Sequence, residues 1–337
     1  MPKNPGRAVE LRTVMSKRAL LTAFWGLIAL NLLTFLAAYP GISNLGSAQH
    51  LIAKDFSAYY VGGWRLFHDT ARIYTRGFIN DGEIHVYPVQ EQFKYLPSFL
   101  LMFSPFLLFD YQQGIVLFDV FQLVLLPLIG LLLYLLVKDK GPTMTFLVAV
   151  AVLLLPSPDP GWGMSIAYFW QWKEGQAKVL ETFLLLLSFA LGTRNRPLLS
   201  GMTFGLSFFD PRFAIVAVPL FVMYNKLKIR SSGFALITTL VVSNFPLFYP
   251  GTAAGFLNMV FSTGIGTTFY PYAFIPLLAV VSLGILNHDK IVATFAELHG
   301  KYPRPAASVR KYLSLRPRSE DIRPALLYVR TVSLGLR

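Results

Sequence analysis

A chain of 337 residues with 54% hydrophobic and only 14% charged residues is too apolar for an ordinary soluble domain of this size. This composition predicts a polytopic membrane protein. The formal net charge of +13 does not indicate nucleic acid as a partner, because the basic residues lie in short blocks between apolar runs. The absence of Cys excludes disulfides, thiolate metal sites and cysteine nucleophiles.

The N-terminal region has the pattern of a signal anchor. Residues 1–18 carry five basic groups against one acidic residue, Glu10. Residues 19–38 then run apolar for about one bilayer thickness, and they lack the short apolar core and cleavage site of a secretory signal. We therefore expect an uncleaved span that begins in the cytoplasm. Residues 40–95 follow as an external loop, whose five acidic residues balance five basic ones.

Eight further apolar segments follow, at residues 96–109, 114–137, 143–156, 177–191, 198–209, 213–224, 234–249 and 271–287. If all nine segments crossed the membrane in strict alternation, several basic blocks would be exported, against the positive-inside rule. The segment 96–109 is the best candidate for not crossing, because it contains Pro97 and Pro105 and, at ~1.5 Å per residue, reaches only ~21 Å of a ~30 Å apolar core.

A re-entrant 96–109 segment predicts about eight crossings, within about 8–10 membrane segments of an all-α integral membrane protein. Splitting 114–137 at Pro127 is the competing solution. Either choice leaves four irregular regions on the external face, where they can build one site. These regions are residues 40–95, 157–176, the tip at 210–212 and residues 250–270.

The expected domain organisation is a basic N-terminus at 1–18, a membrane domain at 19–289 and a basic tail at 290–337. The tail holds ten basic residues and four prolines, the composition of a partly disordered cytoplasmic segment. We interpret its charge as attraction to anionic lipid headgroups rather than as a binding motif. Both termini are thus expected on the cytoplasmic side of the cell membrane.

A helix is predicted in the first external loop, just after the first span. Phe56, Tyr60, Trp64 and Phe67 fall on one face at helical spacing, which indicates an amphipathic helix in the outer membrane interface. Asp55 stands at its start. This carboxylate is either an N-cap, which the helix dipole favours, or a general base at the membrane surface.

An ordered series of short motifs extends from residue 19 to about residue 230. It contains Asp55, Tyr59-Tyr60, Gly62, Trp64, Tyr74 and Phe93-Lys94-Tyr95-Leu96-Pro97. It continues with Gly175-Gln176, Arg194-Asn195-Arg196-Pro197, Ser200-Gly201, Phe204-Gly205-Leu206 and Asp210-Pro211-Arg212. In this order the series resembles glycosyltransferase family 87, a family of GT-C membrane enzymes that includes polyprenyl-phosphate-mannose-dependent mannosyltransferases.

The resemblance implies a GT-C-like bundle that transfers a sugar, most simply mannose, from a polyprenyl-phosphate donor to a lipid-linked or cell-surface glycan on the external face. Asp55 matches the family's catalytic carboxylate and would take the proton from the acceptor hydroxyl. Two positions depart from the family pattern. Lys178 stands where Gly-Gln-x-Asn usually has its Asn, and Asp210-Pro211 stands where Lys-Pro is usual.

The leaving phosphate needs cationic donors, and Arg212 is our first choice for this role. A charged residue between two apolar segments is expensive in lipid, and the guanidinium offers a two-pronged donor for phosphate. Its local alternative is simple neutralisation by Asp210 at a hairpin tip. Lys94, beside Tyr95, is the second candidate, with snorkelling to the interface as its alternative.

Further residues are expected around the substrate cavity. The stretch from Tyr168 to Gln176 mixes aromatic side chains with amides and charges, which suits sugar rings and is also typical of a membrane interface. Gln176 begins an apolar helix, so its amide must find a polar partner. The expected cavity residues are Tyr59, Tyr60, Tyr95, Lys173, Gln176 and Asp210.

Other charged groups admit several interpretations. Asp119 and Glu181 fall within or near apolar runs, where a hydrogen bond between helices is the default and a proton or ion pathway the alternative. Asp81 and Glu83 resemble an acidic metal pair, but no spacing specifies a site, so we expect no resident metal or cofactor beyond a weakly held divalent ion. The alternatives to a transferase are a lipid or solute transporter and an assembly subunit without chemistry.

Overall fold

The computed structural model of the chain describes residues 17–38, 54–75, 92–154, 156–159, 163–166, 168, 171–172, 175–262 and 274–301. These residues are helical apart from one antiparallel pair of short strands, β1 (Pro156–Asp159) and β2 (Gly163–Ile166). The expected all-helical architecture is confirmed to that extent. Contacts divide the chain into two units, Met1–Ile291 and Val292–Arg337, and the arrangement below is that of the first unit.

The helices in chain order are α1 (Lys17–Ala38), α2 (Lys54–His68), α3 (Pro97–Phe103), α4 (Tyr111–Val137), α5 (Pro142–Leu153), α7 (Lys178–Thr193), α8 (Pro197–Ser207), α9 (Pro211–Asn225), α10 (Ile229–Ser243), α11 (Pro250–Ser262), α12 (Phe274–Leu286) and α13 (His288–Lys301). Each predicted apolar segment contains one of these helices, within a few residues of its expected bounds. Short 3-10 turns, such as η3 (Ser104–Leu108) and η6 (Phe245–Phe248), follow α3 and α10.

The longest helix, α4, is continuous. Asp110 caps it by accepting a hydrogen bond from the Gln113 amide at 2.8 Å. Pro127 lies inside the helix without dividing it, so the competing split of 114–137 is wrong. By length and composition, the described helices include one that is long enough to cross a membrane, at Tyr111–Lys140, or two if α12 and α13 together form one span.

Residues 96–109 form no long helix. They fold as α3 followed directly by η3, with Pro97 in the first turn of α3 and Pro105 in the first turn of η3. Proline is favoured at such positions because it lacks the amide proton that the first turn leaves unpaired. The Asn244 side chain accepts a hydrogen bond from the Ser98 amide at 2.9 Å and ties this piece to the end of α10.

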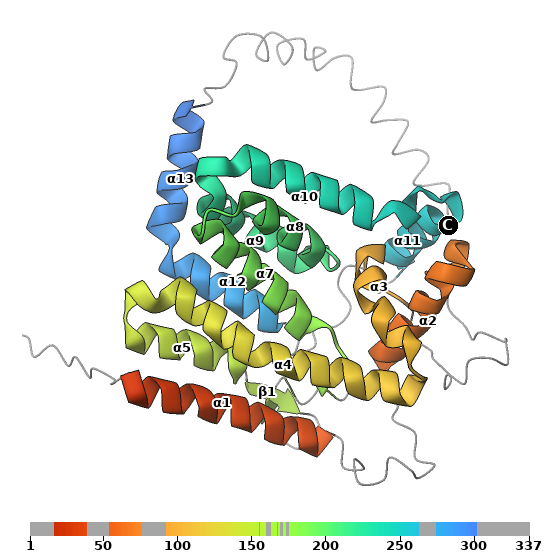
Figure 1. Cartoon of the computed structure of the whole chain (residues 1–337), viewed down its shortest axis with the longest axis horizontal. Coiled ribbons are helices and arrows are strands. Elements are labelled where there is room, and N and C mark those ends of the chain that lie inside the picture. The colour runs from red at the N-terminus through yellow and green to blue at the C-terminus, as the bar shows by residue number, and fades with distance from the viewer. Residues whose placement is uncertain are drawn as a thin grey trace, which may run out of the picture. The chain divides into compact units, whose positions relative to one another are not determined.

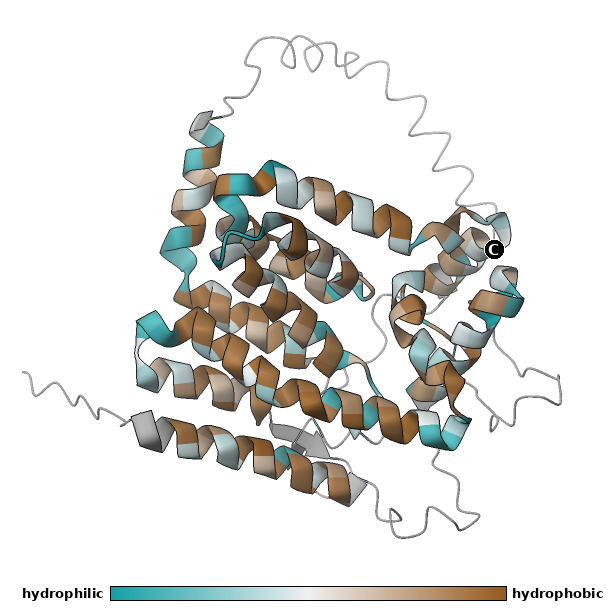
Figure 2. Cartoon of the chain, viewed as in Figure 1, coloured by the Kyte–Doolittle hydropathy of each residue, from teal (hydrophilic) through white to brown (hydrophobic). Residues whose placement is uncertain are grey.

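The two ends of the bundle contain different elements. Figure 1 shows α2, α3 and α11 together at one end, whereas the turns that join α4 to α5, α7 to α8 and α9 to α10 lie at the opposite end. Figure 2 shows that these turns are hydrophilic. They contain Lys138, Lys140, Arg194, Arg196, Lys226 and Lys228. The basic blocks therefore gather at one end, as the re-entrant interpretation requires.

Two expectations for irregular segments need correction. Residues 250–262 form α11, although we expected an irregular external region there. Residues 288–301 form α13, although we expected a partly disordered tail from residue 290. Both helices are short and mix polar with apolar residues, so neither stands out from the sequence as a membrane segment. The remaining tail, residues 302–337, lies outside the described part of the chain.

The predicted helix after the first span is present as α2. Residues 56–63 are all buried, whereas Phe67 and His68 in its last turn are exposed. Its place in the membrane interface stays a prediction. Its two glycines explain how it is covered. A Cβ at Gly62 would lie 3.3 Å from the Phe93 ring, and one at Gly63 would lie 2.9 Å from Leu107, so the re-entrant piece packs directly on the α2 backbone.

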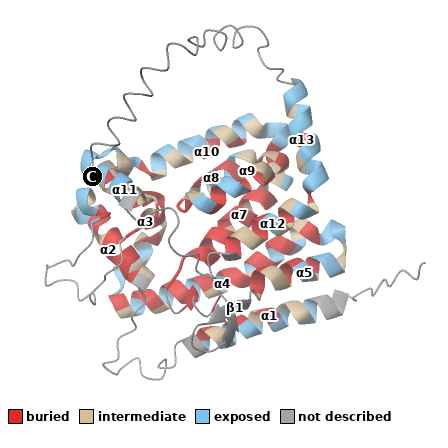
Figure 3. Ribbon diagram, turned by 180° about the vertical axis from the view of Figure 1, so that it is seen from behind, coloured by how far each residue is buried: buried red, intermediate tan, exposed pale blue. Residues whose placement is uncertain are grey.

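The inner halves of α7 and α4 form the core, whereas α1 and α10 lie on the outside (Figure 3). The close approach of α8 and α10 depends on small residues. A Cβ at Gly201 would overlap the Ser232 carbonyl oxygen and lie 2.9 Å from the Ala235 Cβ. Gly205 faces Thr239 in the same way, at 2.9 Å. Small residues four apart are a common means of close packing between membrane helices.

A neutral polar cluster joins α7, α8 and α9. The Ser188 hydroxyl donates to the Ser200 carbonyl at 3.0 Å, and the Ser200 hydroxyl donates to the Ser188 carbonyl at 2.9 Å. The Asn225 amide nitrogen donates to the Ser200 hydroxyl at 2.9 Å and to the Phe221 carbonyl at 3.0 Å. All three side chains are buried, and these hydrogen bonds hold three helices together.

Candidate functional site

The first turn of α7 holds a buried lysine. Lys178 is the first residue of the helix, and its side chain is almost completely buried. Its ammonium group contacts Glu181 Oε2 at 3.0 Å, one turn along the same helix. It also forms a close ion pair with Asp210 Oδ2 from the connection between α8 and α9. A positive charge is disfavoured at the N-terminal end of a helix, so the two carboxylates are needed to keep Lys178 charged there.

Asp210 is the N-cap of α9 and receives several donors at once. Its Oδ1 accepts from Arg212 Nε at 2.8 Å, and its Oδ2 accepts from an Arg212 terminal nitrogen at 2.6 Å. Burial raises the pKa of Asp210, but Lys178 and these Arg212 hydrogen bonds outweigh burial and hold that pKa well below its usual range. The expected Asp210–Arg212 pair is therefore present, and Lys178 joins it.

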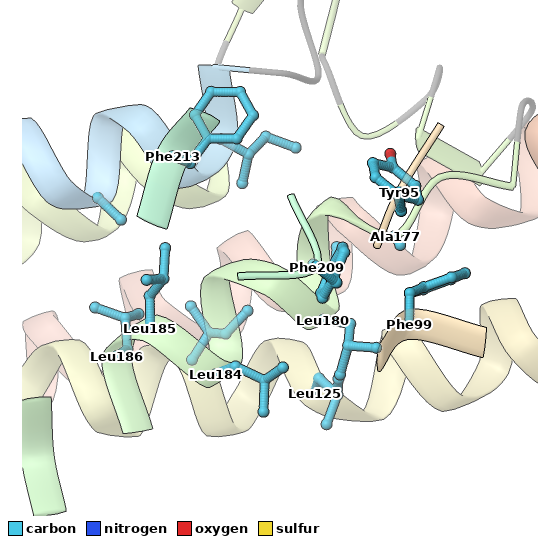
Figure 4. Close-up of a cluster of buried hydrophobic side chains, with 14 of the residues drawn as sticks. Tyr95, Phe99, Leu125, Ala177, Leu180, Leu184, Leu185, Leu186, Phe209 and Phe213 are labelled. Carbon is cyan, nitrogen blue, oxygen red and sulfur yellow. The ribbon is translucent and has the colours of Figure 1, made fainter. Parts of the chain in front are cut away.

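Tyr95 covers this ionic cluster, which we define as Lys178, Glu181, Asp210 and Arg212. The Lys178 nitrogen lies 5.1 Å from the centre of the Tyr95 ring and 4.7 Å from that of Phe213. Figure 4 shows Tyr95 and Phe209 near Ala177 and Leu180 at the start of α7, and Phe213 in the same buried apolar cluster. The charges thus lie in apolar surroundings, where electrostatic interactions are strong.

Two contacts hold the Tyr95 segment in place. The Tyr74 hydroxyl donates to the Tyr95 carbonyl at 2.9 Å. The Leu96 amide donates to the Phe209 carbonyl at 2.9 Å, which joins the backbone before α3 to the backbone before Asp210. The re-entrant piece and the α8–α9 connection are therefore fixed to each other through main-chain atoms.

A chain of polar side chains extends from Tyr95 into the bundle. The Tyr95 hydroxyl lies 3.4 Å from the Tyr59 hydroxyl and donates to Gln176 Oε1 at 3.3 Å. The Gln176 carbonyl accepts from Gln122 Nε2 at 2.7 Å and also from the Gln171 amide nitrogen. Gln176 thus finds the polar partners that an amide at the start of an apolar helix requires.

Asp55 lies in the first turn of α2, as the second helical residue, and is partly buried. Tyr59, one turn further along α2, contacts the Tyr95 hydroxyl at 3.4 Å, so the start of α2 adjoins Tyr95. Burial raises the pKa of Tyr95 above its usual value; Lys178 lowers it, and the carboxylates of Asp210 and Asp55 raise it again. The two carboxylates therefore both lie within electrostatic range of the Tyr95 hydroxyl.

The other expected site residues lie further from this group or outside the described residues. Tyr60 donates from its hydroxyl to the Phe109 carbonyl at 2.7 Å and so faces the connection between η3 and α4. Lys94 is exposed beside the buried Tyr95. Lys173, Asp81 and Glu83 fall outside the described residues. The roles of these residues stay predictions.

The two buried acids behave differently. Glu181 pairs with Lys178 of its own helix, and its second oxygen, Oε1, makes no hydrogen bond within the described part of the chain. Asp119 is fully buried in α4, and neither of its carboxylate oxygens has a hydrogen-bond partner there. A hydrogen bond between helices, the default explanation for both, therefore accounts for neither.

Three residues of this region were missed as site candidates. Lys178 stood out only as a departure from the family motif. Its two carboxylate partners were not evident from the sequence, because Glu181 lies one turn along the same helix and Asp210 lies 32 residues further along the chain. Gln122 and Gln171 are amides whose partners depend on how α4 meets the start of α7. A polar residue in an apolar run was the only signal available for Gln122.

The arrangement is suited to holding an anion. The N-terminal end of α9, positive by its backbone dipole, lies at the Asp210 carboxylate, which also pairs with Arg212 and with Lys178 from the first turn of α7. A further carboxylate, Asp55, stands in the first turn of α2, one turn before Tyr59, whose hydroxyl contacts that of Tyr95 at 3.4 Å.

Comparison with known proteins gives one match. The family model described as glycosyltransferase family 87 matches residues 93–294, which is more than half of the chain. The matched region contains Tyr95, Gln176 and the whole ionic cluster, whereas Asp55 precedes it. Neither a curated protein nor a solved structure matches the chain.

Proposed function

Because this chain belongs to glycosyltransferase family 87 and is thereby a glycosyltransferase, we propose that it uses a polyprenyl-phosphate sugar as its donor. The sugar is mannose, and the acceptor is a lipid-linked or cell-surface glycan on the external face of the cell membrane. The observation that carries the proposal is the grouping around Tyr95, which has the Asp55 carboxylate within electrostatic range and the Lys178 cation at 5.1 Å from its ring.

The surface of the bundle supports a membrane location. The outward face of α10 exposes large apolar side chains, among them Phe234 at 69% and Val242 at 63%. The outer faces of α1, α4 and α9 do the same, as the exposed Leu33, Val124 and Ile215 illustrate. A monomer in water rarely exposes so much contiguous apolar surface, whereas lipid covers such a surface without penalty.

The distribution of charge supports an orientation. We assign the eight crossings to α1, α4, α5, α7, α8, α9, α10 and α12. Of these, α1, α4 and α10 run lengthwise along the bundle from the end that holds the basic turns (Figure 1). The basic turns then belong on the cytoplasmic side, and Asp55 and Asp210 belong toward the external side. Both chain termini are placed in the cytoplasm by this orientation, and the basic tail lies near anionic headgroups.

The proposed reaction is a direct displacement at the anomeric carbon. The acceptor oxygen forms a bond to this carbon while the bond from the carbon to the phosphate oxygen breaks. Asp55 takes the acceptor proton, and polyprenyl phosphate leaves with the bonding electrons. Arg212 stabilises the developing charge with its two-pronged guanidinium, and Lys94 is the second cation. No resident cofactor is required, although a divalent ion can associate weakly with the donor phosphate.

The polar chain around Tyr95 gives the sugar its contacts. Tyr59, Tyr95 and Gln176 provide two hydroxyls and an amide beside aromatic rings, a combination that suits a hexose. Tyr60, Lys173 and Asp210 complete the proposed cavity. These groups orient the anomeric carbon between Asp55 and the cations, so much of the rate depends on positioning.

Transfer of radiolabelled sugar tests this proposal. Full-length protein in detergent is given radiolabelled polyprenyl-phosphate-mannose and crude lipid acceptor, and wild type is compared with Asp55→Asn. We expect the variant to lose about 100-fold or more in rate, the usual contribution of a general base. Equal transfer by both proteins would remove Asp55 from catalysis.

A non-enzymatic transporter is the alternative, and Asp119 is the observation that favours it. A fully buried carboxylate with no described partner is typical of proton or ion pathways in membrane proteins. The same assay separates the two functions, because a transporter transfers no sugar from any polyprenyl-phosphate donor.

Cysteine labelling tests the orientation, since the chain has no native Cys. Single cysteines are placed at positions 55, 139, 195 and 227 and exposed to a membrane-impermeant maleimide. We expect labelling from outside only at position 55. Labelling of any basic turn from outside would overturn the orientation.

A further inference from the structure

The ionic cluster places a charged lysine where the stability of the fold does not call for a charge. Lys178 combines two unfavourable conditions, because its ammonium is buried and lies at the positive end of α7. Elsewhere along their length, α7, α8 and α9 are joined by hydrogen bonds between Ser188, Ser200 and Asn225, whose side chains are neutral. A buried lysine at this position therefore calls for an explanation beyond stability.

The Asp210 carboxylate has the surroundings of a bound anion. Its Oδ2 is shared between Lys178 and Arg212, its Oδ1 accepts from Arg212 Nε, and the backbone of α9 begins directly beneath it. One helix N-terminus and two cations converge on this one group. Such a set of donors is the usual setting of a phosphate.

An unsatisfied atom beside Lys178 points independently to a ligand. Glu181 has no exposed surface, and its Oε1 has no hydrogen-bond partner among the described residues, whereas its Oε2 is bound to Lys178. A buried carboxylate oxygen left unpaired is costly. A hydroxyl of the donor sugar, next to a phosphate held by Lys178, would satisfy it, because a phosphodiester itself has no hydrogen to donate.

We propose that Lys178 and Arg212 together bind the donor phosphate, and that Asp210 occupies the phosphate position until the donor arrives. This inference rests on the proposed function and deepens it by naming Lys178 as a further cation and Asp210 as a competing internal anion. The phosphate of a sugar phosphodiester carries one negative charge over two free oxygens, as a carboxylate does. The exchange therefore leaves the charge around Lys178 unchanged.

The exposure of Arg212 allows the exchange. Its side chain is 59% exposed, so it can keep contact with an arriving phosphate while Asp210 turns away from the N-terminus of α9. Sugar transfer then converts the phosphodiester into a monoester, which gains a second negative charge near neutral pH. Return of the Asp210 carboxylate to the two cations competes with this product and promotes its release.

Binding of farnesyl phosphate, a short polyprenyl monophosphate, tests the inference. Full-length protein in detergent is titrated while its tryptophan fluorescence is recorded, with farnesol as the uncharged control and inorganic phosphate as the lipid-free control. Asp210→Asn should lower the Kd for farnesyl phosphate about 10-fold, because a neutral amide competes poorly for two cations, and a tenfold change corresponds to about 1.4 kcal/mol. Lys178→Gln should raise the Kd by at least about 10-fold.

A third variant guards against failure to fold. Arg212→Gln changes a largely exposed side chain, so it should fold normally and raise the Kd about 10-fold. Arg194→Gln, at an exposed arginine in the turn after α7, is the matched control and should leave the Kd unchanged. Thermal unfolding in detergent verifies that each variant is folded before its Kd is compared.

The outcomes separate this inference from the proposed function. Asp210→Asn binding that is unchanged or weaker overturns the inference, as does binding that inorganic phosphate reproduces without the lipid. Sugar transfer by wild type with no effect of Lys178→Gln on the Kd would retain the transferase and reject the inference. If the Kd values follow the predicted order but no donor supports sugar transfer, the phosphate site is retained and the transferase is rejected.

Discussion

Helices α7, α8 and α9 carry two polar clusters, and their difference separates helix packing from function. Ser188, Ser200 and Asn225 form a neutral cluster in which each polar group has a partner. About ten residues earlier along α7, or ~15 Å at ~1.5 Å per residue, the ionic cluster places Lys178 and two carboxylates in apolar surroundings. One of its oxygens, on Glu181, lacks a partner among the described residues.

The two clusters differ in what they contribute to the stability of the fold. Neutral hydrogen bonds between membrane helices contribute about 0.6 kcal/mol on average and up to about 1.7. A buried ion pair barely repays the desolvation of its charges and is often less stable than an apolar replacement. The neutral cluster is therefore accounted for by folding, whereas the ionic cluster has to be accounted for by what it binds.

The largest effect is expected where the neutral cluster borders the contact between α8 and α10. Gly201→Leu should destabilise the protein by about 3 kcal/mol or more, because even a Cβ overlaps the Ser232 carbonyl oxygen. Thermal unfolding and size-exclusion elution in detergent measure this effect. Gly233→Leu, on α10 with no atom within 4 Å of its Cβ position, is the matched control and should be tolerated. Equal behaviour of the two variants would contradict the close packing of α8 on α10.

The ionic cluster should respond differently to partial and complete removal. Lys178→Met should destabilise the fold by about 3–5 kcal/mol, because it leaves buried carboxylates without their cation. Adding Asp210→Asn and Glu181→Gln should restore much of the unfolding temperature but no sugar transfer. Recovery of transfer by the triple variant would show that the charges serve only the fold.

The neutral cluster should affect stability alone. Ser200→Ala should lower the unfolding free energy by about 1 kcal/mol, because it removes a hydroxyl that bridges Ser188 and Asn225. The kcat/KM for sugar transfer should stay within about twofold of wild type when each rate is divided by the amount of folded protein. A tenfold loss of kcat/KM in this variant would mean that the neutral cluster also takes part in sugar transfer, against the distinction between the two clusters.

The smallest effect is expected at Asp119, which belongs to neither cluster. Its carboxylate oxygens have no described partner, so Asp119→Asn should leave the unfolding temperature in detergent unchanged or raise it slightly. Differential scanning fluorimetry is sufficient to detect the change. A marked loss of stability would mean that Asp119 binds a partner or an ion in the folded protein.

The sequence predicted the apolar helices well because each depends on local composition. The bounds of α1, α4 and α9 follow from apolar length and capping residues, and the broken segment at residues 96–109 follows from Pro97 and Pro105. The burial of α2 was not predictable, since it depends on Gly62 and Gly63 meeting Phe93 and Leu107, which lie more than 30 residues further along the chain. Similarly, α11 and α13 have no long apolar run to reveal them.

The site was predictable only where a single residue carried the signal. Asp210 with Arg212, and Gln176 with its need for a partner, stood out individually. Lys178 did not, because its meaning depends on Asp210, 32 residues further along the chain. The ionic cluster depends on the meeting in space of the Lys178 side chain with the N-terminus of α9, which no linear pattern records.

The hydrogen bond between the Leu96 amide and the Phe209 carbonyl has a consequence for how this enzyme can change over evolution. Because it uses only main-chain atoms, this hydrogen bond can persist through side-chain changes at Leu96 that keep the backbone amide. Phe209 is more constrained, since its buried ring packs on Tyr95 and Phe99. Variation is therefore easier on the α3 side of this junction than on the side of the ionic cluster.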